Sequence, residues 1–108
     1  MGVRQPYTRG DVYWVNLDPT IGSKIRKTRP AVIVSPTEMN SALPRVIIAP
    51  LTTKGQPLAC RPEVTLQRKP GRILLDQIRS VDKVRLMKRI GSISEDNWLP
   101  TLLEMLAE

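Results

Sequence analysis

A polar loop rich in cations stands between two apolar runs near the start of the chain, within residues 9–36. The loop cations are Lys24, Arg26 and Lys27. Arg29 follows them and is held by Pro30. A guanidinium matches phosphate oxygens in a bidentate fork, and lysines add point charges. We therefore expect Arg29 on a buried edge beside a mobile basic loop, an arrangement that predicts a phosphodiester site and contact with nucleic acid.

Two hydroxyls and an ammonium end the apolar run of residues 46–51, in the sequence Thr52-Thr53-Lys54. Threonine hydroxyls can donate hydrogen bonds to phosphate oxygens, and a nearby lysine strengthens the attraction. The alternative is an ordinary turn, because polar residues commonly end strands.

A third candidate is Asp76-Gln77-Ile78-Arg79. If this segment is extended, Asp76 and Ile78 share one face and Gln77 and Arg79 share the other. Asp76 and Arg79 are alternatively no more than structural partners.

The chain contains no histidine and one cysteine. This composition removes the usual acid–base pair of RNA cleavage and most zinc sites. Cys60 has no histidine to deprotonate it, so we expect it to fill space rather than to act as a nucleophile. The sequence also lacks a glycine-rich phosphate loop and a paired-carboxylate magnesium site. Any catalysis should therefore need no metal or cofactor and should use Arg, Lys, Thr, Ser or carboxylates.

Positive charge is concentrated in the body of the chain. All 17 Lys and Arg but only six of the ten carboxylates lie in residues 1–94, which gives them a net charge of +11. The remaining residues carry −4. Such a body should attract a polyanion, either nucleic acid or an acidic protein.

The length and apolar pattern indicate one soluble domain spanning residues 1–108. No apolar run approaches the roughly 20 residues of a membrane span, and the first residues lack the apolar core of an export signal. We expect a cytoplasmic protein without a membrane anchor.

Short β-branched runs separated by prolines predict a mainly β fold, a small and strongly bent barrel or half-barrel. The expected strands are residues 12–17, 31–34, 46–51, 63–66, 72–75, 78–81 and 86–93. The turn-forming sequence Lys69-Pro70-Gly71 is expected to join the fourth and fifth strands. The first strand is apolar on both sides, so Tyr13 and Trp14 are expected to be barrel or dimer residues.

The carboxy-terminal segment predicts an amphipathic helix packed on the sheet. Ser94 can cap it, and Glu95 and Asp96 favour its positive end. The apolar face would hold Trp98, Leu102, Leu103 and Leu106. Pro100 would interrupt this helix. Either the helix kinks there, or it starts again near Asn97 with Pro100 in its first turn.

Several motifs occur in a fixed order along nearly the whole chain. They are Arg9-Gly10-Asp11, Asp18-Pro19-Thr20 with Gly22, Thr28-Arg29-Pro30 leading into AVIVSP, Pro50-Leu51-Thr52-Thr53, and Asp76-Gln77-Ile78-Arg79-Ser80-Val81-Asp82. In this order they resemble the MazF/PemK/Kid toxins of bacterial toxin–antitoxin modules. The resemblance implies an SH3-like barrel with added helices, a homodimer, and sequence-specific, metal-independent cleavage of single-stranded RNA.

The resemblance also implies roles for individual residues. The family's catalytic arginine and threonine fall on Arg29 and Thr52, and an aspartate proposed as a base in some members falls on Asp76. The chain departs from some members at Ser23, where they carry a histidine, and at Leu74, where they carry an arginine. An acidic antitoxin is implied as a partner that occupies the basic groove and excludes RNA.

RNA supplies its own nucleophile, the 2′-hydroxyl, so the protein must stabilise the charge that develops on the phosphate. Arg29 would do so electrostatically while Thr52 donates to a non-bridging oxygen. The proton would pass to Asp76, to water or to the substrate. The expected products are a 2′,3′-cyclic phosphate and a 5′-hydroxyl. The residues expected to bind RNA are Ser23, Lys24, Arg26, Lys27, Thr28, Thr53, Lys54, Gln77 and Arg79.

Two other function classes remain open. A CcdB-like toxin that binds gyrase shares the implied fold but needs no Arg29 and Thr52 pair. A protein that only binds RNA or an antitoxin is the other alternative.

Overall fold

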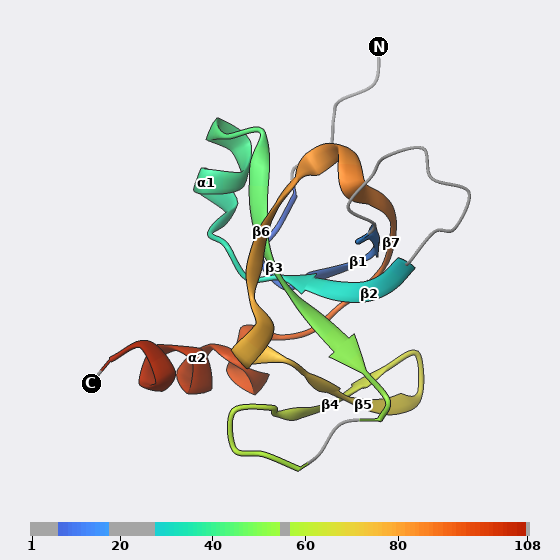
Figure 1. Cartoon of the computed structure of the whole chain (residues 1–108), viewed down its shortest axis with the longest axis vertical. Coiled ribbons are helices and arrows are strands. Elements are labelled where there is room, and N and C mark those ends of the chain that lie inside the picture. The colour runs from blue at the N-terminus through green and yellow to red at the C-terminus, as the bar shows by residue number, and fades with distance from the viewer. Residues whose placement is uncertain (1–6, 18–27, 55–56, 108) are drawn as a thin grey trace.

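Antiparallel strands form the body of the computed structural model, which describes residues 7–17, 28–54 and 57–107. The strands are β1 (Asp11–Asn16), β2 (Thr28–Ile33), β3 (Arg45–Thr52), β4 (Glu63–Leu66), β5 (Lys69–Ile73), β6 (Arg79–Asp82) and β7 (Leu86–Ser92). They pair in the order β4-β5-β3-β2-β1-β7, with β6 also pairing with β3 (Figure 1). This curled sheet with a carboxy-terminal helix confirms the predicted mainly β fold.

The long strand β3 bends the sheet, because different parts of it pair with different neighbours. Residues 45–48 of β3 pair with β6, whereas Leu51 and Thr52 pair with Ile73 and Arg72 of β5. Pro50 pairs with Ala31 of β2. Strand β3 thus joins the part of the sheet that contains β2 and β6 to the β4–β5 hairpin. Thr52, the last residue of β3, lies where these two parts separate.

The β4–β5 hairpin confirms one predicted pairing but turns at a different place. The predicted turn at Lys69-Pro70-Gly71 is wrong: these residues belong to β5, and the turn is Gln67 and Arg68, with φ of 51° and 67°. A two-residue hairpin of this kind needs positive φ at both central positions. Pro70 fits in β5 because the pairing with β3 involves only Arg72 and Ile73.

The short helix α1 (Thr37–Ala42) was not expected from the sequence. A buried side chain holds it: Asn40 Nδ2 donates to the carbonyl oxygens of Tyr7, at 2.8 Å, and Ser35, at 3.1 Å. The Ser35 hydroxyl donates to Asn40 Oδ1 and accepts from the backbone N–H of Ile47. The helix therefore depends on a tertiary polar network and not on an apolar period.

The carboxy-terminal helix starts again just after Asn97, which is one of the two alternatives predicted. A 3₁₀ turn covers Glu95–Asn97, and α2 (Leu99–Leu106) follows with Pro100 in its first turn. Trp98 and Leu102 are buried, but Leu103 and Leu106 are exposed, so the predicted packing of those two side chains is wrong. No helix among the described residues is long and apolar enough to cross a membrane.

The core divides into two apolar clusters on either side of the curled sheet. One joins β4, β5 and α2 and includes Val12, Ile73 and Trp98. The other lies between β1, β2, β3 and β6 and includes Val15 and Ile48. Strand β1 contributes to both clusters, which fits its predicted burial on both sides.

Candidate functional site

A cavity of about 370 Å³ opens where β1, β2, β3, β7 and the β4–β5 hairpin meet. Its polar lining residues are Arg29, Thr52, Thr53, Gln67 and Lys69. Its apolar lining includes Trp14, Pro30, Leu51, Leu66 and Ile90. An apolar cavity with a few polar groups is the usual form of a ligand site.

The register of the sheet brings Arg29 and Thr52 together. Ala31 of β2 pairs with Pro50 of β3, and the same antiparallel register carried two residues further sets Arg29 opposite Thr52. Arg29 is exposed, so the prediction that it lies on a buried edge is wrong. Burial on β2 begins only at Ala31, because Arg29 belongs to the end of the strand that borders the cavity.

The Thr52 side chain is held by its own turn. Its Oγ1 accepts a hydrogen bond of 3.1 Å from the backbone N–H of Lys54. The hydroxyl proton of Thr52 is then available for donation to a ligand. Gly71 permits the close approach of β5, since a Cβ at that position would lie 3.0 Å from the Thr52 carbonyl oxygen.

The cavity contains two cationic side chains that can receive an anion. The ion pairs of the described residues involve Arg45, Arg61 and Arg89. The side chains of Arg29 and Lys69 form no ion pair or hydrogen bond with any part of the chain that the structure describes. Two cations without a carboxylate partner favour a ligand that carries negative charge.

Asp76 lies outside the lining of this cavity. It belongs to a 3₁₀ turn, Leu75–Gln77, so the predicted alternation of an extended segment is wrong at this position. Its carboxylate accepts two hydrogen bonds from Arg61, from Nε at 3.0 Å and from Nη2 at 2.9 Å. Arg61, not Arg79, is therefore its partner. The hydrogen bond from Arg61 holds the pKa of Asp76 below its ordinary value. The catalytic role of Asp76 stays a prediction.

The other residues predicted to bind RNA are dispersed. Thr53 lines the cavity, whereas Thr28, Lys54 and Arg79 are exposed outside its lining. Gln77 ends the 3₁₀ turn beside Asp76 and also lies outside the lining. Four predicted RNA-binding residues lie outside the part of the chain that the structure describes: Ser23, Lys24, Arg26 and Lys27.

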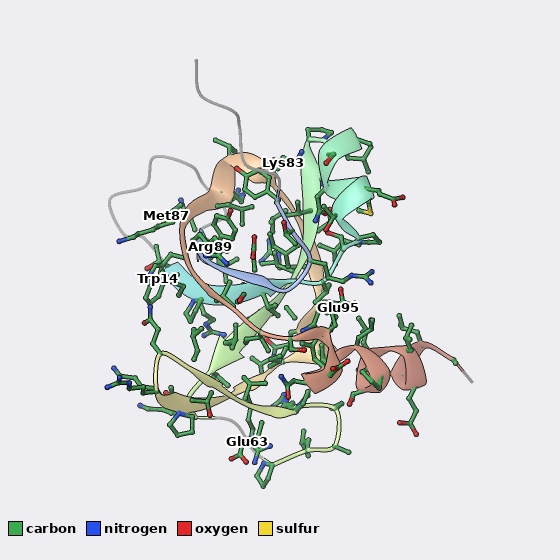
Figure 2. All side chains as sticks on the ribbon, turned by 180° about the vertical axis from the view of Figure 1, so that it is seen from behind. Trp14, Glu63, Lys83, Met87, Arg89 and Glu95 are labelled. Carbon is green, nitrogen blue, oxygen red and sulfur yellow. The ribbon has the colours of Figure 1, made fainter. Side chains whose placement is uncertain are left out.

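Among the polar and aromatic lining residues, three were not predicted from the sequence as site residues: Trp14, Gln67 and Lys69. Trp14 was expected in the barrel or at a dimer contact, and in the single chain the residue is 39% exposed. In Figure 2, Trp14 lies near the start of β2. Trp14 pairs with Pro30, next to the Val15 and Arg29 pair, and both Trp14 and Arg29 line the cavity. No local pattern marks Gln67 or Lys69, because only the closure of the sheet brings their hairpin to the cavity.

Solved structures with the same fold include three toxins and toxin complexes. Mycobacterium tuberculosis toxin MazF-mt6 is 24% identical, with a TM-score of 0.70 over 87% of this chain and 89% of that one. A MazE–MazF structure from Deinococcus radiodurans is 25% identical, with a TM-score of 0.71 over 92% and 94%. A mycobacterial endoribonuclease in complex with its cognate antitoxin is 22% identical, with a TM-score of 0.70 over 93% and 90%. The fold implied by the sequence resemblance is thereby confirmed.

The sequence itself matches a family model over residues 8–102, and the family is described as PemK-like, MazF-like toxin of type II toxin–antitoxin system. The match includes every described strand, the cavity and both helices as far as Leu102. The chain belongs to the PemK/MazF-like toxin family.

Proposed function

We propose that this toxin is a metal-independent endoribonuclease that cuts single-stranded RNA at specific sequences. The observation that carries the proposal is the meeting of Arg29 and Thr52, from two different strands, in one cavity with an exposed tryptophan. A structural neighbour described as an endoribonuclease supports the reaction class.

The reaction that fits these groups is an internal transfer at phosphorus. The ribose 2′-oxygen attacks the adjacent phosphorus, the bond to the 5′-oxygen breaks, and the products are a 2′,3′-cyclic phosphate and a 5′-hydroxyl. The guanidinium of Arg29 stabilises the added negative charge on the non-bridging oxygens, and the Thr52 hydroxyl donates to one of them. DNA lacks the 2′-hydroxyl and is not cut.

In this proposal the proton of the 2′-hydroxyl passes to water or to a phosphate oxygen, and the departing 5′-oxygen takes up a proton from water or from that phosphate oxygen. Arg29 is a poor base because arginine keeps its proton in proteins. Asp76 is paired with Arg61 and has a lowered pKa, which weakens it as a base. We therefore give Asp76 a structural role and assign the chemistry to Arg29 and Thr52.

The apolar side of the cavity would hold an unstacked base. Trp14 is exposed and lines the same cavity as Arg29 and Thr52. Stacking of a base on an aromatic side chain is worth about 1–3 kcal/mol and does not depend strongly on the base. Trp14 would thus increase affinity, while base identity is read elsewhere.

We also propose that an acidic antitoxin blocks RNA by occupying the same basic surface, and that the toxin acts as a cytoplasmic homodimer. Neighbouring structures described as antitoxin complexes support an antitoxin partner. Because RNA and the antitoxin would share the cations of the cavity, saturating antitoxin should prevent RNA binding.

The test uses one RNA and the all-DNA oligonucleotide of the same sequence, incubated with the protein in EDTA. The unaltered protein should cut only the RNA, and Arg29→Ala and Thr52→Ala should each lower the rate about 10²- to 10³-fold. Arg68→Ala is the matched control, because Arg68 is exposed and lies outside the cavity. Failure to cut RNA with inhibition of gyrase would instead support the CcdB-like alternative. Loss of cleavage in EDTA would contradict the metal-free mechanism.

A further inference from the structure

One wall of the cavity consists of the β4–β5 hairpin. The residues at its tip that line the cavity are Leu66, Gln67, Lys69, Pro70 and Gly71. Arg29 and Thr52 come from β2 and β3, so the hairpin faces the ligand from a separate part of the sheet. A ligand whose phosphate lies at Arg29 and Thr52 would therefore present its attached base or neighbouring nucleotide to this wall.

The hairpin tip is fixed against β7. Gln67 Nε2 donates a hydrogen bond of 3.0 Å to the Ile90 carbonyl oxygen. The Leu66 side chain packs so close to Gly91 that a Cβ there would lie 3.0 Å from Leu66 Cδ1. The turn residues Gln67 and Arg68 adopt positive φ, which tightens the hairpin. These contacts give the wall a defined position, as discrimination between similar ligands requires.

Lys69 is the one cation that this wall contributes to the cavity lining. It is paired with Leu66 across the hairpin, and its ammonium has no partner among the described residues. An ammonium has three donors and no acceptor, so it can bond only to acceptors on a base edge. Guanine presents two acceptors on one edge, O6 and N7, and uracil and cytosine each present a carbonyl oxygen, whereas adenine presents N7 beside an amino group that is itself a donor and disfavours an ammonium there.

We propose that Lys69 is a specificity-determining residue that selects against adenine at one position beside the cleaved bond, with Gln67 as the residue that positions its hairpin. This inference rests on the proposed ribonuclease function. It separates two roles within the cavity: Arg29 and Thr52 bind the phosphate, and Lys69 reads a base.

The test is the cleavage of an RNA pool of random sequence, with the cut ends sequenced, by the unaltered protein and three variants. Lys69→Met keeps the length of the side chain but removes the donors, and should lower the discrimination against adenine about tenfold or more at one position. Lys69→Gln should make adenine favoured there, because an amide can pair with both adenine N6 and N7. Gln67→Ala should relax the same position, since the wall loses its hydrogen bond to β7.

Arg68→Met is the matched control, because it removes the same charge from the adjacent position of the same hairpin but lies outside the cavity lining. Its base preference should equal that of the unaltered protein. Thermal unfolding of each variant identifies any that fails to fold. Lys69→Gln changes an exposed residue, so it gives a second measurement of base preference if Lys69→Met does not fold.

The outcomes separate the two proposals. If the unaltered protein cuts no RNA, both the ribonuclease function and this inference are overturned. If it cuts RNA and the Lys69 variants slow cleavage equally at every sequence, Lys69 contacts phosphate and only this inference is overturned. A change of preference in Arg68→Met equal to that in Lys69→Met would also overturn it, because the effect would then be one of general charge.

Discussion

The Arg61 and Asp76 pair shows how a residue's partner decides what its charge can do. Asp76 is the aspartate of a family motif, and it could serve as a base if its carboxylate were unpaired and lined the cavity. In the structure its carboxylate accepts two hydrogen bonds from the Arg61 guanidinium. Arg72 Nη1 in turn donates a hydrogen bond to the Arg61 carbonyl oxygen. The carboxylate therefore holds the segment that leads into β4.

Replacing Asp76 with asparagine should lower the free energy of unfolding near neutral pH. Because Arg61 lowers the pKa of Asp76 in the folded protein, the pair stabilises the fold above the ordinary aspartate pKa of about 4. That stabilisation is lost as the pH falls through the lowered pKa. The stability difference between the unaltered protein and Asp76→Asn should thus shrink below about pH 4, as measured by urea unfolding across pH.

Asp82→Asn is the control, because its ion pair with Arg45 is half exposed and should contribute little. RNA cleavage by folded Asp76→Asn should stay within a few-fold of the unaltered rate. A loss as large as that expected for Arg29→Ala would instead identify Asp76 as catalytic.

At the scale of the elements, Gly10 joins three strands at one point. Its N–H donates to the Ile33 carbonyl oxygen of β2, and its carbonyl oxygen accepts from Ile93, just after β7, each at 2.8 Å. The residue itself leads into β1 with a φ of 95°. A side chain at this position would place Cβ 2.8 Å from the Ile93 carbonyl oxygen. The junction therefore requires glycine on two independent grounds.

Gly10→Ala should lower the free energy of unfolding by about 1–3 kcal/mol, because alanine is strained at this φ and meets the Ile93 backbone. Chemical denaturation measures the change. Gly91→Ala is the comparison: its added Cβ meets only the movable side chain of Leu66, so the loss should be smaller. An equal effect in both variants would contradict the argument from backbone strain.

Across the whole molecule, the basic body and acidic tail predict that RNA binding depends on salt. The net charge of residues 1–94 is +11, against −4 for the rest of the chain. Each cation that meets an RNA phosphate releases counterions, which steepens the fall of affinity with salt. The slope of affinity against salt therefore counts the phosphate contacts.

Arg29→Met should reduce the log–log salt slope by about 0.7, the value for one phosphate contact on a single strand. Lys69→Met should leave the slope unchanged, because Lys69 is assigned to a base. Fluorescence anisotropy with an RNA carrying 2′-O-methyl groups measures binding without cleavage. Equal reductions of the salt slope in both variants would mean that Lys69 contacts the RNA phosphate backbone instead of a base.

Local patterns were sufficient for much of this molecule. Alternating and β-branched runs predicted the strands, and β4 was predicted with its observed bounds, Glu63–Leu66. Pro100 predicted either a kink or a new start of the last helix, and the structure has the new start, with the proline in the first turn. Arg29 and Thr52 were proposed from the sequence as groups that suit a phosphate, and both line the same cavity. These features depend on neighbours in the sequence, so the sequence by itself determined them.

Only the tertiary structure decided the partners of those residues. Asp76 meets Arg61, Trp14 borders Arg29, and Lys69 reaches the cavity because β3 turns the sheet and β5 pairs with its end. The helix α1 likewise depends on Asn40 bonding to distant carbonyl oxygens. Such contacts are set by strand register and sheet curvature, which join segments far apart in the chain. Local propensity says nothing about which side chains that closure will bring together.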